Sequence, residues 1–427
     1  MLCRLPLCLL ILAVIWQCAS YTDETAEVRQ NFYKGDFQLA LEKLEKSPLK
    51  DSSRNLLLFQ LEKAMIFDRL GDRQQSRKLL IAADRQVDKL YTTSILNTAS
   101  SFLINDSTQD YGGEDYEKVA IHTMLALSFL QDKSLEEAGV EARKINLILD
   151  KITKEYAQKF NGYREDALAL YLSALIHEAQ REDDDAIIDY QKALTTFAHP
   201  HYRQFYLGAV PDHLVRALYL LAGKNQRSEL KEQLKETYPD IVKTAEEGLK
   251  AGLTSQIVSI HEIGHIAIKR ANDFVIPLGG QIIRLSFPYI AYNERYSFGT
   301  TGLDLEGEGF FPGRNLAYLS AIAHFALEER RGRMILKSAA RLIAKAALTN
   351  KAYDAFGPLG GIAANVASAV TETADTRGWT LLPDAFSVSR AWLKPGKHRM
   401  KLMSEGRLDK VEMVETSAGK IAIFRSY

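Results

Sequence analysis

Between residues 24 and 250 the apolar positions recur at the spacing of amphipathic helices. After a turn at Gly35-Asp36, one face of the next helix collects Phe37, Ala40, Leu41 and Leu44. The same kind of turn returns at Gly71-Asp72, and later polar turns fall at Asp132-Lys133, Asp183-Asp184 and Gly223. Each turn separates two apolar-periodic stretches, so the pattern predicts a series of helical hairpins.

A helix, a short polar turn and a second helix, repeated about every 34 residues, is the pattern of tetratricopeptide repeats. The first interval fits that period, and insertions such as the polar INDSTQDYGGEDYEK lengthen the later ones. Stacked hairpins bury a continuous core and leave a concave face for a peptide or protein. An irregular helical bundle is the alternative.

Beyond Gly252 the apolar period becomes that of β-strands. Ile and Val dominate QIVSIHEIGHIAIKRANDFVIPLGGQIIRLSFPYIAY, and Gly279-Gly280 punctuates it. We expect strands over about residues 255–300, a glycine loop in LDLEGEGFFPG, helices over 313–372 and strands over 380–427. The final strands are expected to form hairpins, one around Pro395-Gly396 and another within KVEMVETSAGKIAIFRSY.

The predicted architecture is therefore mainly α with a smaller α+β C-terminal part. Residues 21–250 would form a TPR-like helical-hairpin solenoid. Residues 251–427 would form a β-rich module with an inserted helical block.

Residues 1–20, MLCRLPLCLLILAVIWQCAS, break the pattern with one arginine and a short apolar run. This is the composition of a secretory signal, and the run is too short to span a bilayer. The chain has three cysteines, all in this region (Cys3, Cys8 and Cys18), which excludes a disulfide framework in the remainder. Cys18 stands where a lipoprotein carries its lipidated cysteine. Trp16 and Gln17 are larger than usual there, so ordinary cleavage after Ser20 is the alternative.

The charge balance limits the classes of partner. The 427 residues include 54 basic and 54 acidic side chains, a formal net charge of zero. This balance argues against wholesale binding of nucleic acid. Nucleophile-elbow, Walker A and dinucleotide fingerprints are absent from the sequence.

The stretch HEIGH, residues 261–265, matches H-E-x-x-H. On a helix, His261 and His265 would share one face and bind zinc, with Glu262 activating a water. The surrounding residues are β-branched, however, and Gly264 interrupts a helix. On a strand the two histidines would stand about 13 Å apart, too far for one ion. No third ligand is evident, so we predict a β-hairpin with surface histidines and no cofactor, with a zinc-dependent hydrolase as the alternative.

Two further polar groups have both a structural and a functional interpretation. Glu372, Asp375, Arg377 and Trp379, in TETADTRGW, would form either a ligand site or a buried network at a helix-to-strand junction, which we favour. Arg333, Lys337, Arg341 and Lys345 recur every four residues. They would contact lipid headgroups or glycan, or more simply form a solvated helix face, which we favour.

Three segments together resemble a family of uncharacterised proteobacterial envelope lipoproteins with tetratricopeptide-like repeats. YGGEDYEKVAIHTMLALSFLQDKSLEEAGVEARKIN matches the family's Y-x-G-E-D-Y-E and E-A-x-V-E-A-R-x-x-N elements. TETADTRGWTLLPDAFSVSRAWLKPGKHRMKL matches its A-D-T-R-x-W-x-x-L-P and P-G-x-H elements, and 257–289 matches a strand–Gly–strand segment more loosely. The resemblance spans most of the chain after residue 20.

What the resemblance implies is a lipoprotein on the periplasmic side of the bacterial envelope, anchored in the outer membrane through Cys18. The family has no established activity to carry over. The repeats themselves, without a convincing catalytic motif, lead us to expect a non-enzymatic scaffold that binds proteins on their concave face. The family also implies a link to outer-membrane assembly or to peptidoglycan synthesis. Glycan binding by the C-terminal module is a further possibility.

Overall fold

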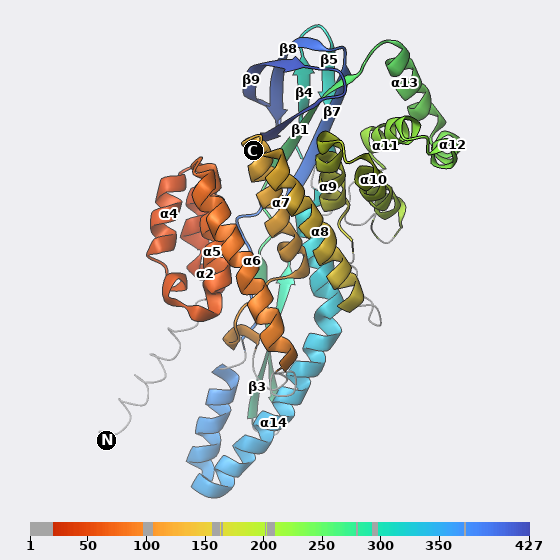
Figure 1. The fold of residues 1–427 in the computed structure, drawn as a ribbon. Coiled ribbons are helices and arrows are strands. Elements are labelled where there is room, and N and C mark those ends of the chain that lie inside the picture. The colour runs from red at the N-terminus through yellow and green to blue at the C-terminus, as the bar shows by residue number, and fades with distance from the viewer. Residues whose placement is uncertain are drawn as a thin grey trace. The chain divides into compact units, whose positions relative to one another are not determined.

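The computed structural model describes the chain except for residues 1–19, 97–105, 156–162, 164, 201, 203–209, 279–280, 293–297 and 371–372. Figure 1 draws the helices and strands of the chain, which divides into two compact units. Unit 1 holds the described residues up to Gly113 together with Ala267–Ala291 and Arg330–Leu381. Unit 2 holds Glu114–Ile266, Tyr292–Glu329 and Leu382–Tyr427.

Helical hairpins form the N-terminal part of unit 1. Its elements are α2 (Tyr21–Glu24), α3 (Ala26–Tyr33), α4 (Phe37–Glu45), the short 3-10 helices η1 (Pro48–Asp51) and η2 (Ser53–Asn55), α5 (Leu56–Arg69), α6 (Arg73–Leu96) and η3 (Asp106–Thr108). The turns after α3 and α5 lie at the two Gly-Asp pairs that the sequence predicts. Leu44, Leu58 and Leu61 are fully buried in the resulting core.

Unit 2 continues with more hairpins. Its helices are α7 (Asp115–Gln131), α8 (Leu135–Glu155), α9 (Ala167–Gln180), α10 (Asp183–Ala198), α11 (Asp212–Lys224), α12 (Ser228–Thr237) and α13 (Pro239–Lys250). Each turn between paired helices carries one residue with a positive φ. In unit 1 this residue is a glycine, whereas in unit 2 it is Lys133, Arg181 or Gln226. The common turn geometry explains why the hairpins recur, and the missing glycines explain why the later ones are harder to read from sequence.

Two four-stranded sheets complete unit 2. The first has the order β10-β1-β7-β6 and the second has the order β5-β4-β8-β9. The strands are β1 (Ser255–Ile263), β4 (Gly302–Leu305), β5 (Gly309–Pro312), β6 (Arg314–Tyr318), β7 (Ala385–Leu393), β8 (Gly396–Ser404), β9 (Arg407–Thr416) and β10 (Ile421–Ser426). β1 is central: it pairs antiparallel with β7 and parallel with β10.

The two sheets enclose one apolar core, so they form a β-sandwich. The core contains Ile257 of β1, Leu303 and Leu305 of β4, Ala391 and Leu393 of β7, Met400 and Leu402 of β8, and Val414 of β9. All nine residues of β7 are buried. A strand that is buried along both faces has neighbours on each face. One face of β7 contributes Ala391 and Leu393 to the core, and the opposite face carries Arg390 and the polar network described below.

Unit 1 also contains a two-stranded sheet and most of a long helix. β2 (Lys269–Leu278) pairs antiparallel with β3 (Gln281–Ile290). The helix α14 (Leu319–Val370) starts in unit 2, and its backbone leaves the helical conformation at Gly357, just before Pro358. Among the described residues, none of the helices is both long and apolar enough for a membrane span.

The fold class agrees with the sequence prediction, because helical hairpins precede a β-rich part with an inserted helix. The predicted boundary at residue 250 marks the point where helices give way to strands. It does not coincide with a boundary between the two compact units. Unit 1 combines N-terminal helices with β2, β3 and most of α14. Unit 2 likewise combines helices α7–α13 with the sandwich. The reason is that β7 is covered on both faces. One face packs in the sandwich core and the other contacts the helix α9, so helices from early in the chain share a unit with strands from its end.

Three predicted hairpins are absent. The strands on either side of Pro395-Gly396 lie in different sheets, so this turn links the two layers of the sandwich. The turn at Gly419 likewise leads from β9 in one sheet to β10 in the other. β1 does not pair with β2, although HEIGH ends β1 and leads towards β2. A turn signal shows where a strand ends, but not which strand becomes its partner.

Two other expectations are corrected locally. The LDLEGEGFFPG segment is not a loop but the hairpin β4–β5, with Gly307 at positive φ in its turn and Gly309 at positive φ at the start of β5. The helical block predicted from residue 313 begins at Leu319, because 314–318 form β6 and pair with β7.

The basic stripe of α14 is not a fully solvated face. Arg341 is buried and donates to Ser338, and Lys337 lies 3.3 Å from Asp106. Ile335, Leu336 and Ile343 of the same helix are instead exposed. The side chain of Lys345 lies outside the description. This helix therefore turns part of its polar face inward and part of its apolar face outward.

Candidate functional site

Unit 2 contains a groove of about 540 Å³ between successive helical hairpins and the edge of the sandwich. Residues of α9, α11, α12 and α13 line it together with the starts of β1 and β10 and the end of β7. We call it the repeat groove. Its apolar wall consists of Leu220, Leu221, Leu249, Leu253, Trp392 and Ile421. Such a surface suits apolar side chains of a binding partner.

A buried ion pair supports the wall of the repeat groove. Arg390 of β7 donates from Nη2 to Glu178 of α9 at 2.6 Å, and neither side chain is more than 9% exposed. Gln256 of β1 accepts from Arg390 Nε at 2.8 Å and donates to Glu178 at 3.1 Å. Tyr190 of α10 donates to Glu178 at 2.8 Å and accepts from Arg390 at 2.7 Å. The closed network fixes two helices against two strands.

Two guanidinium groups contact the ring of Trp392. The guanidinium carbon of Arg216 is 4.2 Å from the ring centroid and that of Arg390 is 4.9 Å away. Cation–π contacts of this kind hold an indole in one orientation. The buried indole N–H of Trp392 has no acceptor among the described residues. Burial and the charge of Arg390 lower the pKa of Arg216 to about 10. The wall is therefore rigid and locally positive.

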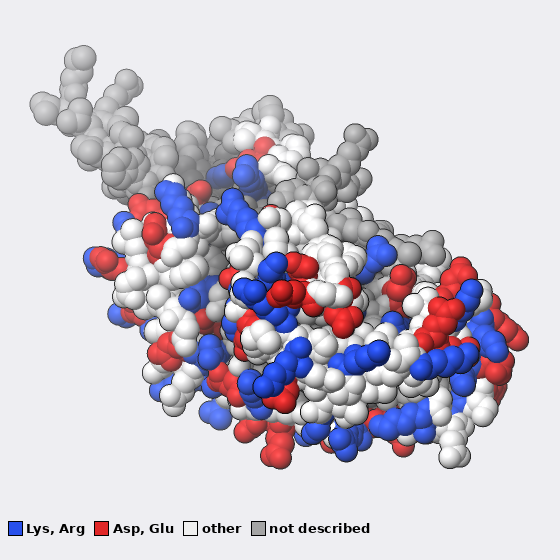
Figure 2. Space-filling view, turned by 90° about the horizontal axis from the view of Figure 1, so that it is seen from above, with Lys and Arg blue, Asp and Glu red and all other residues white. Residues whose placement is uncertain are grey.

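Charges of both signs surround the apolar wall. Lys224 forms an ion pair with Asp183 at 2.7 Å, and Lys231 lies over the ring of Tyr219. Tyr219 donates to Glu246 at 2.6 Å, and burial together with this contact raises its pKa above the ordinary value. Figure 2 shows the same mixture on a larger scale, since basic and acidic residues alternate over the drawn face. This rim suits a mixed-charge peptide better than a polyanion.

The HEIGH residues are placed by β1, which confirms that 261–263 are strand and not helix. His261 is fully buried, contrary to the expectation of a surface histidine, and its Nε2 lies 2.7 Å from the hydroxyl of Ser259. Burial lowers its pKa to about 4. His265 lies beyond the strand and is exposed. Only half of the surface-histidine prediction therefore holds.

Glu262 leaves the opposite face of β1 from His261. Its carboxylate accepts a hydrogen bond from Nε of Arg425 on β10, and both side chains are buried. Glu262 therefore neutralises an arginine and does not face a shared ligand site. His261, Glu262 and His265 form no zinc site in this structure, which removes the geometric basis of the hydrolase alternative.

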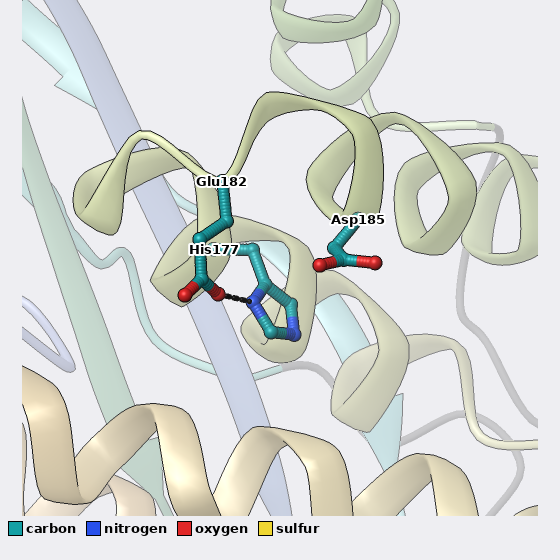
Figure 3. Close-up of side chains that lie close together, drawn as sticks. All are labelled: His177, Glu182 and Asp185. Carbon is teal, nitrogen blue, oxygen red and sulfur yellow. Dashed lines mark hydrogen bonds and ion pairs between the residues drawn. The ribbon is translucent and has the colours of Figure 1, made fainter.

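A different group meets the distance requirement for a metal ion among the described residues. His177, Glu182 and Asp185 have ligand atoms within 4.8 Å of one another. Figure 3 shows Glu182 hydrogen-bonded to the imidazole and Asp185 on the next helix. The His177 Nδ1 contact is 2.6 Å, and Nε2 lies 3.9 Å from Asp189. Because the carboxylates of Glu182 and Asp185 face solvent, the group is sufficiently explained as a link between α9 and α10.

The A-D-T-R segment lies in unit 1. Asp375 and Arg377 form a two-bond ion pair, at 2.8 Å to Nε and 2.7 Å to Nη2. Arg377 also donates to the carbonyls of Gln109 and Asp106, both at 2.7 Å. Trp379 is buried nearby in the sequence, at 1% exposure. Glu372 and Cys18 lie outside the described residues.

Sequence reasoning missed the residues that shape the repeat groove, above all Glu178, Arg390 and Trp392. One indication was present, because Arg390 interrupts the otherwise apolar and small strand FSVSRAWL. A charge in such a strand requires a buried partner. The identity of that partner, more than two hundred residues earlier on α9, cannot be read from the strand.

Comparisons with known proteins add the following. No protein-family model matches the chain, and no curated protein matches it. Among solved structures, MamA is similar at 14% identity over 54% of this chain and 93% of that chain, with a TM-score of 0.31. BtubC from P. vanneervenii is similar at 15% identity over 53% of this chain and 80% of that chain, with a TM-score of 0.32. At these scores the description of helical hairpins rests on the helix pairs of the chain itself.

Proposed function

We propose that the protein is a non-enzymatic scaffold that binds a protein partner through the repeat groove. The observation that carries the proposal is the apolar wall of the groove, built by helical hairpins and strands together and held by a fully bonded ion pair. The preferred partner segment has an apolar side chain for the wall and charged residues of both signs for the rim. Tetratricopeptide-like hairpins are suited to this task because their stacking leaves a groove.

The proposal includes a location. The apolar N-terminal run and Cys18 support export and lipidation, which would anchor the scaffold on the periplasmic side of the bacterial outer membrane. The resemblance to envelope lipoproteins supports the same place and a role near outer-membrane or peptidoglycan assembly. The anchor would hold the groove close to partners in the envelope.

The groove is tested by a substitution on its exposed apolar wall. Leu249 of α13 is 57% exposed, so Leu249→Asp should fold while spoiling the wall. The matched control is Leu147→Asp on α8, where the leucine is 66% exposed and outside the groove. With a photo-crosslinking residue at Lys231 in the producing cells, Leu249→Asp should lower the yield of the adduct about tenfold. Equal yields for both variants would refute the groove as the binding site.

The anchor is tested separately. Cys18→Ala should abolish incorporation of a labelled fatty acid and move the protein from the membrane fraction to the soluble fraction. Fatty-acid labelling that persists in Cys18→Ala would contradict lipidation at Cys18. So would a native chain that takes up no label and fractionates like the variant. The native N-terminus, read by mass spectrometry, distinguishes a lipidated Cys18 from cleavage after Ser20.

A further inference from the structure

Unit 1 contains a separate polar hollow of about 960 Å³. It is bordered by α2, α3, η2, η3, the sheet β2–β3 and the segment 373–377. Five arginines line it: Arg29, Arg54, Arg270, Arg284 and Arg377. Hydroxyl side chains, among them Thr22, Thr108 and Ser286, lie between them. We call it the arginine hollow.

Two of the five arginines are neutralised by carboxylates. Arg377 is held by Asp375, with a shortest contact of 2.7 Å. Arg284 of β3 lies 2.9 Å from Asp273 of β2, and both side chains are about one-third exposed. These pairs consume two of the four carboxylates that line the hollow.

Arg29 is a buried cation without such a partner. It is 8% exposed, and it donates to the carbonyl of Thr22 at 2.7 Å and to the hydroxyl of Thr25. Both acceptors are uncharged, and no ion pair to Arg29 occurs within the described part of the chain. A guanidinium removed from water with only neutral acceptors keeps a large unbalanced charge. That charge attracts an anion into the hollow.

Arg54 and Arg270 add two exposed guanidiniums, and neither forms an ion pair with a described residue. The carboxylates that remain are Asp23 and Glu24. Asp23 accepts from the backbone N–H and hydroxyl of Ser20, at 3.2 and 2.7 Å. For Glu24, partial burial and Asp23 raise the pKa, while Arg54 lowers it, with a net increase. Asp23 and Glu24 therefore offset only part of the charge of Arg29, Arg54 and Arg270.

We propose that the arginine hollow binds a phosphate monoester group carried by a small polar molecule. Guanidinium forks match the oxygens of a phosphate. The lining holds five arginines and four carboxylates, so one positive charge remains in excess to attract an anion. The hydroxyls on the wall suit a polyhydroxylated carrier such as a sugar. This site is independent of the repeat groove, which lies in unit 2.

The experiment uses the full chain, with inorganic phosphate and glucose 6-phosphate as probes in isothermal titration calorimetry. We expect a dissociation constant of about 1 mM or lower for glucose 6-phosphate. Because Arg54 and Arg270 are exposed, the double variant Arg54→Gln/Arg270→Gln should keep the fold and weaken binding at least about tenfold. Arg227→Gln, an exposed arginine of unit 2, is the matched control and should change nothing.

The proposal would be overturned if neither inorganic phosphate nor glucose 6-phosphate bound. It would also be overturned if the double variant bound them as tightly as the native chain. Binding of citrate in preference to both phosphates would overturn it as well, since it would assign the hollow to carboxylates. Leu249→Asp should leave phosphate binding unchanged. A failure of the repeat groove and a failure of the arginine hollow are therefore distinguishable.

Discussion

Arg390 and Glu178 meet at 2.6 Å although they lie 212 positions apart in the sequence, one on a strand of the sandwich and one on a helix of the repeats. Arg390 is fully buried and the Glu178 side chain is only 9% exposed. Every donor of the Arg390 fork is engaged by Glu178, Gln256 or a tyrosine hydroxyl. The pair makes the helical and the β-rich parts of unit 2 one structural body, which is why the groove between them has a rigid wall.

Removing one member of this pair should be costly. Arg390→Met leaves the Glu178 carboxylate buried without a counter-charge, and we expect a loss of about 3–5 kcal/mol in the free energy of unfolding. Urea denaturation followed by circular dichroism measures it. The comparison variant is Arg227→Met, which breaks an ion pair of equal length, 2.6 Å, between side chains that are 55% and 72% exposed. That change should cost less than about 1 kcal/mol. Similar losses for the two variants would show that burial of the Arg390 pair contributes nothing.

The turn geometry of the hairpins yields a second prediction. Gly71 has a φ of +82° and no atom near the position of an added Cβ, so Gly71→Ala introduces backbone strain without a clash. We expect a loss of about 1 kcal/mol. Lys133 occupies the equivalent turn position at a φ of +60°. Lys133→Gly should therefore be neutral or stabilising by about 0.5 kcal/mol. Thermal melting of both variants checks the opposite signs.

The buried His261 predicts a pH dependence. Its pKa is about 4 in the fold against 6.5 in the unfolded chain, so the unfolded chain takes up a proton first as the pH falls. The stabilising contribution is complete above pH 6.5 and is lost towards pH 4, at most about 3 kcal/mol. His213 acts in the same direction, with its pKa lowered to about 3 by burial and nearby arginines. The difference in the free energy of unfolding between the native chain and His261→Gln, measured at each pH, isolates the contribution of this one histidine. Parallel stability curves from pH 7 to pH 4 would contradict the assignment.

Arg377 should be required for local order in unit 1. Arg377→Lys keeps the charge but loses the fork that joins Asp375 to the carbonyls of Asp106 and Gln109. Hydrogen exchange of the 106–111 backbone should accelerate, by about tenfold or more. Exchange in α9, which belongs to unit 2, serves as the internal control. Unchanged exchange in 106–111 would mean that other contacts fix the segment.

The helices and strands could largely be predicted because they depend on local periodicity. The turns at Gly35-Asp36 and Gly71-Asp72 lie where the sequence places them, since glycine marks a positive φ. Strand partners could not be predicted in the same way. The sequence around Pro395-Gly396 is compatible with a hairpin within one sheet and with a turn between two sheets. The choice depends on β1 and β4, which occupy the positions beside β7 and β8.

The candidate site was less accessible to sequence reasoning than the fold. H-E-x-x-H was the most visible motif, yet its residues serve the sandwich: His261 lies in the buried strand and Glu262 pairs with Arg425. The residues that shape the repeat groove carry no motif. Glu178 and Trp392 become informative only when a helix and a strand are placed side by side, and no local pattern encodes that placement.

The position of β1 in its sheet has a consequence for how the chain is made. Ser255 contacts a carbonyl 138 residues further along, and Glu262 contacts an arginine 163 residues further along. A ribosome adding 5–20 residues per second would leave this apolar strand without its neighbours for about 7 to 30 seconds. During that time both its edges are open to other chains. We therefore expect the yield of native protein to depend on the supply of chaperones that shield β1 before its partner strands arrive.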